Sequence, residues 1–232
     1  MYRKTGPDRK VCDRKLCTYQ DFTIFDSDFR SINSSWLTDT AVNFAASYLK
    51  DEIIGKGDEK VSLVYAFLCE MVKYTNPEST DEIRELLQSV NVQPDKWCFF
   101  LLNDNSDPTA VSGGTHWTLL VHAPFQNTLF QFDPIFDIRP MHCLAFFTRI
   151  RTYLHDDYRV MPCPKMSMNG SCGIYVVEYL NSIFKYIRNG GQRLQEADLS
   201  GIDDRWAISR RVFYCDLINQ LAVEQGKEPV VL

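Results

Sequence analysis

The sequence predicts an α+β domain, because the spacing of its apolar residues changes along the chain. In the first half and again in the last third, apolar residues recur every three or four positions, as in amphipathic helices. Between these regions lie short runs rich in aromatic and branched residues, each bounded by turn residues, as in buried strands. Since helices and strands do not alternate regularly, we expect one sheet with helices packed around it.

Three helices are predicted before the sheet. Thr38 or Asp39 can cap a helix that runs through Leu49. Apolar residues at spacings of three and four predict a second helix over residues 61–74 and a third over residues 81–90. The first half of the domain is therefore expected to be largely helical.

The sheet and the elements after it follow from the same reasoning. Residues 96–103, 116–123 and 128–133 are predicted to be neighbouring buried strands. The later elements that we expect are a helix over 141–154, a strand over 158–164, a long helix over 172–187 that ends at Asn189-Gly190-Gly191, and a final amphipathic helix over 205–224.

Composition and net charge argue against a membrane protein and a nucleic-acid-binding protein. The 232 residues contain no apolar run long enough for a membrane span, and the first ten residues lack the apolar centre of a secretory signal. We therefore expect a location in the cytoplasm and/or nucleus, with no membrane partner. A net charge of −5 argues against nucleic-acid binding, which needs clustered Lys and Arg. We expect a monomer.

The basic residues at the start of the chain suggest a domain boundary. Residues 1–22 have few large apolar side chains, so we expect a basic flexible arm there and one folded domain over residues 23–232. A localisation signal or a docking arm is the alternative function for residues 1–22. No linker divides the chain after this point.

Most of the eight cysteines lie within apolar segments, where a reduced thiol packs as a small hydrophobic group. Cys12 and Cys17 form a loose pair, but no neighbouring Cys/His pair supplies the other ligands of a zinc site. We therefore predict no metal and no cofactor.

Cys172 differs from the other cysteines because it lies in the loop GSCG at the start of a long helix. At such a position, the backbone N–H groups and the helix dipole lower a thiol pKa and stabilise negative charge. A buried structural cysteine is the alternative. A thiol nucleophile also needs a base and a group that orients this base.

His116 and Asp133 can supply these two functions. His116 opens one predicted strand and Asp133 ends the next, so an antiparallel hairpin would bring both side chains to one end of the sheet. Taken alone, Asp133 before Pro134 can also be a turn residue. The other histidines, His122, His142 and His155, lie within or at the ends of predicted elements and are expected to have no comparable partner.

Four motifs occur in the order SSWLTD, GGTHW, FQFDP and GSCGIYVVEYL. In this order and spacing, residues 25–220 resemble the sentrin/SUMO-specific cysteine protease family. The resemblance implies a papain-like architecture, with a central mixed sheet flanked by helices and the nucleophile at the N-terminus of a long central helix. It also implies that Cys172 is the nucleophile, His116 the general base and acid, and Asp133 the orienting carboxylate.

The segment FFLLNDNS followed by GGTHWTLLV is most similar to the deneddylase branch of this family, although an insertion over residues 108–111 lengthens the loop between them. The resemblance implies hydrolysis after the C-terminal Gly-Gly of a ubiquitin-like modifier. The expected partners are this modifier and its conjugates, cullins among them, with SUMO as the alternative modifier.

The same resemblance implies a substrate-binding group. Trp36 and Trp117 would form the walls of a tunnel for Gly-Gly, since only residues without a Cβ pass flat between two indole rings. Asp39 would face a basic residue near the modifier tail, and Asn103 and Asp104 would line the same groove. The alternatives are core packing for the tryptophans, helix capping for Asp39, and a plain turn for Asn103.

The chain departs from the family pattern at two positions. Met166 stands where the family has a glutamine that donates to the oxyanion, and Ser171 stands where it usually has an aspartate. A thioether cannot donate a hydrogen bond, but Asn169 can substitute if its loop folds differently. A weakened or inactive relative that only binds the modifier therefore remains an alternative. An acyl transferase is a weaker one, because the chain lacks an internal basic cluster.

Overall fold

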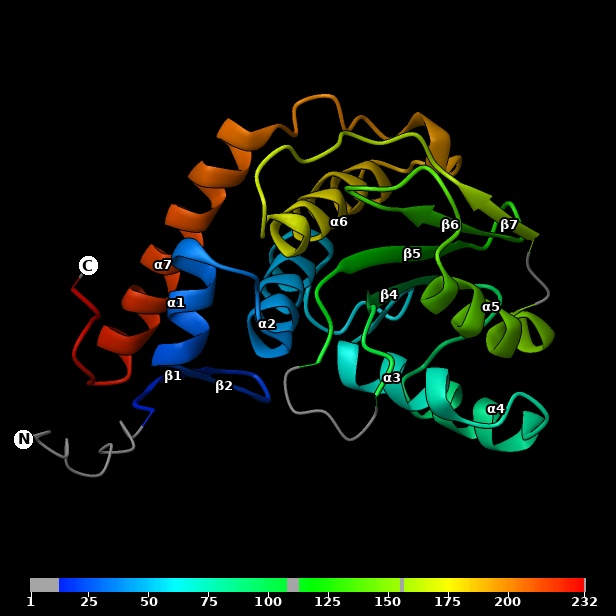
Figure 1. The fold of residues 1–232 in the computed structure, drawn as a ribbon, viewed down its shortest axis with the longest axis horizontal. Coiled ribbons are helices and arrows are strands. Elements are labelled where there is room, and N and C mark those ends of the chain that lie inside the picture. The colour runs from blue at the N-terminus through cyan, green and yellow to red at the C-terminus, as the bar shows by residue number, and fades with distance from the viewer. Residues whose placement is uncertain (1–12, 108–112, 155–156, 232) are drawn as a thin grey trace, which may run out of the picture.

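The computed structural model describes residues 13–107, 113–154 and 157–231. In these segments a five-stranded sheet has the order β3-β4-β5-β6-β7 (Figure 1). Its strands are β3 (Val61–Val64), β4 (Trp97–Asn103), β5 (Trp117–Ala123), β6 (Thr128–Phe132) and β7 (Asp157–Val160). The two outer pairs are parallel and the two inner pairs are antiparallel, so the sheet is mixed, as predicted.

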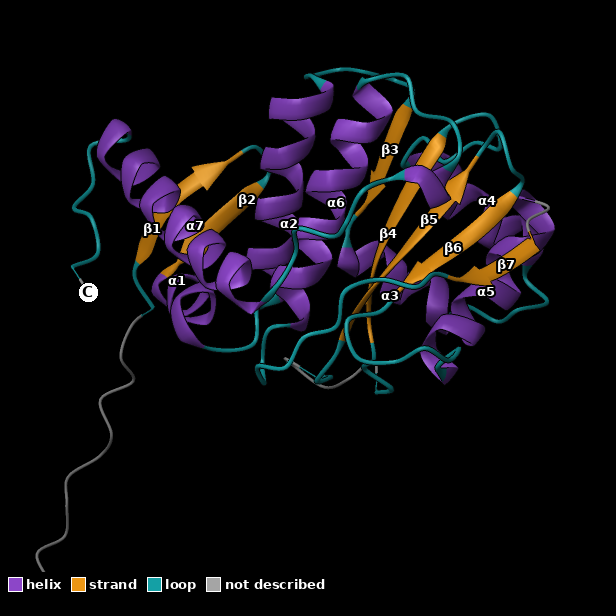
Figure 2. Ribbon diagram, turned by 90° about the horizontal axis from the view of Figure 1, so that it is seen from above, coloured by secondary structure: helices purple, strands orange, loops and turns teal. Residues whose placement is uncertain are grey.

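Helices cover both faces of this sheet (Figure 2). The helical elements are α1 (Asp26–Ser34), α2 (Asp39–Leu49), η1 (Lys50–Ile54), α3 (Ala66–Tyr74), α4 (Thr80–Ser89), α5 (Met141–Leu154), α6 (Cys172–Arg188), η2 (Leu194–Glu196) and α7 (Asp204–Glu224). Helices α2 and α6 pack on one face, and α3, α4 and α5 on the other. Within the described segments, no helix has the length and apolar character that a membrane span requires.

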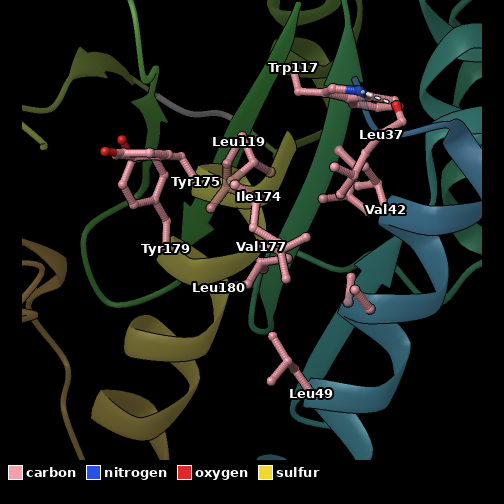
Figure 3. Packing of buried hydrophobic residues seen from close by; sticks show 14 of the residues in the cluster. Leu37, Val42, Leu49, Trp117, Leu119, Ile174, Tyr175, Val177, Tyr179 and Leu180 are labelled. Carbon is pink, nitrogen blue, oxygen red and sulfur yellow. Dashed lines mark hydrogen bonds between the residues drawn. The ribbon is translucent and has the colours of Figure 1, made fainter. Parts of the chain in front are cut away.

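The alternation of side chains along β4 explains the two layers of core. Phe99 and Leu101 belong to the cluster under α2 and α6, whereas Phe100 and Leu102 belong to the cluster under α3, α4 and α5. All seven residues of β4 are buried for this reason. Figure 3 shows the first cluster, in which side chains of α6, α2 and β5 interlock. Each fully buried Leu or Phe contributes about 1.5–3 kcal/mol.

The expected boundary between residues 22 and 23 is wrong. Strands β1 (Lys15–Tyr19) and β2 (Phe22–Phe25) form an antiparallel hairpin that packs against α7. Leu16 and Cys17 are buried, so residues 13–22 are part of the folded domain. The apolar run of β1 is too short to stand out in a basic segment, and its partner α7 lies at the opposite end of the sequence. Residues 1–12 lie outside the described residues, Cys12 among them.

The predicted helix over residues 61–74 is wrong in its first part. Residues 61–64 form β3, which pairs in parallel with β4, and only residues 66–74 are helical. Apolar spacing alone does not distinguish a short buried strand from a helix. The side-chain oxygen of Asn43 accepts a hydrogen bond from Ala66 N, which fixes the point where the strand gives way to the helix. The other predicted helices and strands are present: α5 has the predicted bounds, and the ends of most of the others are shifted.

Candidate active site

Cys172 is the first residue of α6 and is fully buried. Gly170 in the loop before the helix has φ +79°, and Gly173 is closely packed: a Cβ there would lie 3.0 Å from Leu37 Cβ and 3.2 Å from Trp117 Cδ1. The nucleophile candidate is thus placed at a helix N-terminus, where the free N–H groups favour an anion.

Other thiols lie in surroundings that suppress reactivity. Burial raises the pKa of Cys17 and of Cys215 to about 11, and it raises the pKa of Cys69 and Cys143 as well. A thiolate is the reactive form of cysteine, so these four groups are poor nucleophiles at neutral pH.

His116 and Asp133 meet at one end of the sheet, as the predicted hairpin requires. His116 immediately precedes β5 and Asp133 immediately follows β6, and these antiparallel strands bring His116 Nε2 to 2.9 Å from Asp133 Oδ1. The same Oδ1 accepts hydrogen bonds from the backbone N–H groups of Ile135 and Phe136, at 2.8 and 2.9 Å. Burial alone would raise the pKa of Asp133, but these donors and the charge of His116 hold it below its ordinary value.

The electrostatics of His116 connect it to the thiol. Burial alone would lower the pKa of His116, but Asp133 first and Cys172 second raise it to about 9. His116 Nδ1 is buried and has no hydrogen-bond partner among the described residues. Since Asp133 occupies Nε2, Nδ1 is the nitrogen left for a thiol proton. A thiol nucleophile needs an adjacent base, and the free Nδ1 gives His116 that position.

Asp104 holds the backbone on which His116 sits. Its Oδ1 accepts hydrogen bonds from the N–H groups of Thr115 and His116, at 2.6 and 2.9 Å. Asp104 N in turn donates to His116 O at 3.0 Å. These contacts fix the backbone just before β5, so the position of the imidazole of His116 is restrained.

The four predicted substrate-binding residues, Trp36, Asp39, Asn103 and Trp117, line one pocket of about 590 Å³. Trp117 is only 2% exposed and its Nε1 donates to Leu37 O at 3.1 Å (Figure 3), so it is both a pocket wall and a core residue. Trp36 is 47% exposed, which excludes core packing as its role.

Helix capping by Asp39 and a turn at Asn103 were the alternative roles of these two residues, and only the second is observed. Thr38, and not Asp39, is the N-cap of α2, because Thr38 Oγ1 accepts from Ala41 N at 3.2 Å. Asp39 is therefore available on the exposed rim of the pocket. Asn103 does form the predicted turn, since its Oδ1 accepts from Asn105 N at 2.8 Å. A Cβ on Gly114 would lie 1.8 Å from this same Oδ1, so only glycine fits beside it.

The structure does not bring Asn169 into this pocket. Asn169 is exposed and lines a separate pocket of about 410 Å³ together with Ser171 and Arg211. Met166 packs against the core, with its backbone N–H donating to Pro134 O at 2.9 Å. Neither residue therefore places a side-chain N–H in the pocket of Trp36 and Trp117.

Thr118 and His142 contact the candidate triad, and neither was predicted from the sequence. Thr118 Oγ1 donates to Asp133 Oδ2 at 3.1 Å and lies 3.2 Å from His142 Nε2. The expectation that His142 has no comparable partner is wrong. Thr118 was detectable, because it lies two residues after His116 and so shares its side of β5. His142 was not, because its approach depends on how α5 packs. His155 lies outside the described residues.

The site can therefore perform nucleophilic acyl chemistry with a thiol, an imidazole and a carboxylate. Across the described residues, no group of three His, Cys, Asp or Glu side chains is arranged to hold a metal ion.

Comparisons with known proteins agree with this geometry. The family model described as the Ulp1 protease family, C-terminal catalytic domain, matches residues 35–214. The chain is 25% identical to sentrin-specific protease 8 of Mus musculus, covering 90% of this chain and 95% of that protein. It is 22% identical to NEDD8-specific protease 1 of Arabidopsis thaliana, covering 91% of each.

A solved structure shares the fold. The Ulp1 protease domain in complex with Smt3, the yeast orthologue of SUMO, superposes with a TM-score of 0.66 at 20% identity, covering 90% of this chain and 89% of that one. The family match spans most of the chain and includes Trp36, His116, Asp133 and Cys172. The chain therefore belongs to the Ulp1 protease family and resembles its deneddylase members.

Proposed function

We propose that this chain is a thiol protease that hydrolyses the peptide or isopeptide bond after the C-terminal Gly-Gly of a ubiquitin-like modifier, with NEDD8 as the preferred modifier. The observation that carries the proposal is the buried His116–Asp133 hydrogen bond of 2.9 Å, with the second ring nitrogen left for Cys172 at the N-terminus of α6. The adjoining pocket of Trp36 and Trp117 supports a narrow, extended substrate tail.

In this mechanism Cys172 gives its proton to His116 and attacks the carbonyl carbon of the terminal glycine, forming a C–S bond. As the C–N bond breaks, His116 passes that proton to the leaving amine. His116 then takes a proton from water, whose oxygen attacks the thioester. His116 returns this proton to the departing sulfur, which regenerates the thiol, and the modifier leaves as a carboxylate once its acid proton passes to solvent. Asp133 holds the imidazole in the tautomer that this sequence needs.

The developing oxyanion needs hydrogen-bond donors. The backbone N–H of Cys172 at the helix N-terminus can serve as one of them. Met166 supplies none from its side chain. Turnover is therefore expected to be slower than with a glutamine at this position, while modifier binding is unaffected.

The choice of NEDD8 rests on the relatives. One relative is named as a NEDD8-specific protease, and another is a sentrin-specific protease 8. The Ulp1 structure with bound Smt3 makes SUMO the competing choice. The test is cleavage of C-terminally extended NEDD8, SUMO and ubiquitin, each measured at equal concentration. We expect kcat/KM for NEDD8 to exceed the other two by at least about a hundredfold, the discrimination that ~2.7 kcal/mol provides. Equal rates would refute the preference.

Two variants separate chemistry from folding in this assay. Cys172→Ala is expected to abolish cleavage and retain modifier binding. Cys69→Ala removes a thiol from the core on the opposite face of the sheet and is expected to retain cleavage. Cleavage by Cys172→Ala would exclude the mechanism.

A modifier-binding protein without efficient catalysis is the second candidate, and Met166 is the observation that favours it. Modifiers with a C-terminal electrophile discriminate the two, because trapping a thiolate asks less of the oxyanion donors than amide hydrolysis does. Capture together with cleavage supports the protease. Capture without cleavage supports the binding protein.

A further inference from the structure

A hydrogen-bonded chain continues beyond the triad on the side away from Cys172. Asp133 Oδ1 faces His116, and Asp133 Oδ2 accepts from Thr118 Oγ1 at 3.1 Å. Thr118 Oγ1 lies 3.2 Å from Nε2 of His142, the second residue of α5. The rings of His142 and His116 are 6.2 Å apart at 81°. The four side chains thus come from the ends of β5 and β6 and from α5.

The number of protons available shows which side chain donates and which accepts in each of these hydrogen bonds. Thr118 has one O–H, and the ionised Asp133 can only accept, so this proton points to Oδ2. The hydroxyl oxygen of Thr118 is then left as an acceptor. His142 must therefore donate from Nε2–H, which makes Nδ1 its unprotonated nitrogen.

Because the side chains are buried, water cannot replace a lost hydrogen bond between Thr118 and Asp133. Asp133 and Thr118 are both 0% exposed. A buried carboxylate oxygen that loses its donor is left unsatisfied, and the ionised form of the acid is then disfavoured. In a pair that shares one proton, this shifts the balance from imidazolium and carboxylate toward imidazole and carboxylic acid.

We propose that Thr118 and His142 are positioning residues of this protease, which keep Asp133 ionised and oriented so that His116 stays protonated opposite Cys172. The proposal rests on the proposed function and extends it to two residues that do not touch the substrate. His142 directs the Thr118 proton to Asp133, and Thr118 delivers the hydrogen bond.

The charges around His142 favour its neutral form. Burial first, and then the charge of His116, lower the pKa of His142 to about 4. Lys73 on α3 acts in the same direction, whereas Asp104 after β4 and Asp133 after β6 oppose it. His142 is therefore neutral throughout the working range of a thiol protease and remains a donor through a single N–H.

The test measures the rate at which iodoacetamide alkylates Cys172, as a function of pH and without substrate. Thr118→Val keeps the shape and removes the hydroxyl. We expect the apparent pKa of alkylation to rise by about one unit, and kcat for modifier cleavage to fall about tenfold with KM changed less than about twofold. Thr118→Ser keeps the hydroxyl and is expected to match the wild-type profile.

His142 provides an independent pair of variants. His142→Gln retains an N–H donor without a titrating ring and is expected to keep the wild-type profile, whereas His142→Leu is expected to shift it in the same direction as Thr118→Val. This pair keeps the proposal testable if Thr118→Val fails to fold. Identical profiles for His142→Gln and His142→Leu would overturn the role of His142.

Thr128→Val is the matched control, since Thr128 is also a buried sheet threonine whose hydroxyl donates to Gln126 O at 2.8 Å. It is expected to lose stability without changing the alkylation profile. A Thr118→Val profile that coincides with wild type would overturn the proposal alone. A wild-type protein that cleaves none of the extended modifiers would instead refute the proposed function.

Discussion

At the scale of single residues, the candidate site depends on two groups whose pKa values move in opposite directions. The pKa of Asp133 is held below its ordinary value and that of His116 is raised to about 9, so an ion pair is favoured across the neutral range. The sequence identified both residues because strand periodicity placed them at one sheet end. It missed Thr118 and His142, whose contribution depends on the packing of α5 against β5.

The raised pKa of His116 predicts a pH-dependent stability. Its favourable interactions are fully present below the unfolded-state pKa of about 6.5 and are lost as the pH rises through about 9. The free energy of unfolding is therefore expected to fall between pH 6.5 and 9.5 by up to roughly 3 kcal/mol. Urea unfolding across this range measures it, and His116→Gln should lack this component. An equal decline in both proteins would contradict the assignment.

Met166 predicts a gain of function. Met166→Gln restores the oxyanion donor that the family pattern has at this position, and kcat is expected to rise about tenfold or more, since one such donor is typically worth 10²–10³. Met168→Gln, two residues along the same loop, is the control and should leave kcat unchanged. If kcat of Met166→Gln stays at the wild-type value, another donor already serves the oxyanion.

At the scale of elements, the sequence predicted helices α2 and α4 to α7 and strands β4 to β7 because each has a clear apolar period or a clear cap. Two errors share one cause. Strands β1 and β3 are four or five residues long, and their burial comes from partners distant in the chain, α7 for β1 and β4 for β3. No local pattern contains that information.

The hairpin of β1 and β2 provides a stability prediction. Leu16 is 1% exposed in β1, so Leu16→Ala is expected to lower the free energy of unfolding by about 2–4 kcal/mol. The exposed neighbour Lys15 is the control, and Lys15→Ala should change stability by less than about 0.5 kcal/mol. Chemical denaturation monitored by tryptophan fluorescence measures both. Equal denaturation midpoints for the two variants would show that residues 13–22 do not contribute to the stability of the domain.

At the scale of the whole molecule, one buried guanidinium connects three parts of the chain near the candidate nucleophile. Arg211 on α7 donates to Ser31 O and Ile32 O on α1, at 3.2 and 2.7 Å, and to Gly170 O in the loop before Cys172 at 2.9 Å. Burial lowers the pKa of Arg211, and the charge of Cys172 opposes this. Arg211 therefore holds the loop before Cys172 against α1 and α7.

Arg211→Met should therefore destabilise the fold around the candidate nucleophile. It removes this donor from Ile32 O and Gly170 O, while Ser31 O keeps the N–H of Ser35, so the free energy of unfolding is expected to fall by about 2–4 kcal/mol. Arg211→Lys should recover part of this loss. Arg205→Met, at an exposed position in the first turn of the same helix, is the control. Stability of Arg211→Met equal to that of the control would show that the three bonds do not brace the site.

The complete arrangement joins the thiol at the start of α6, the imidazole–carboxylate pair at the sheet end, and the tryptophan pocket. Its most direct test is to react the protein with NEDD8 that carries a C-terminal electrophile and to identify the modified cysteine by mass spectrometry. We expect a single adduct on Cys172, which disappears in His116→Gln. An adduct on another cysteine would contradict the role of Cys172 as the nucleophile. The same conclusion would follow if the NEDD8, SUMO and ubiquitin electrophiles all failed to react.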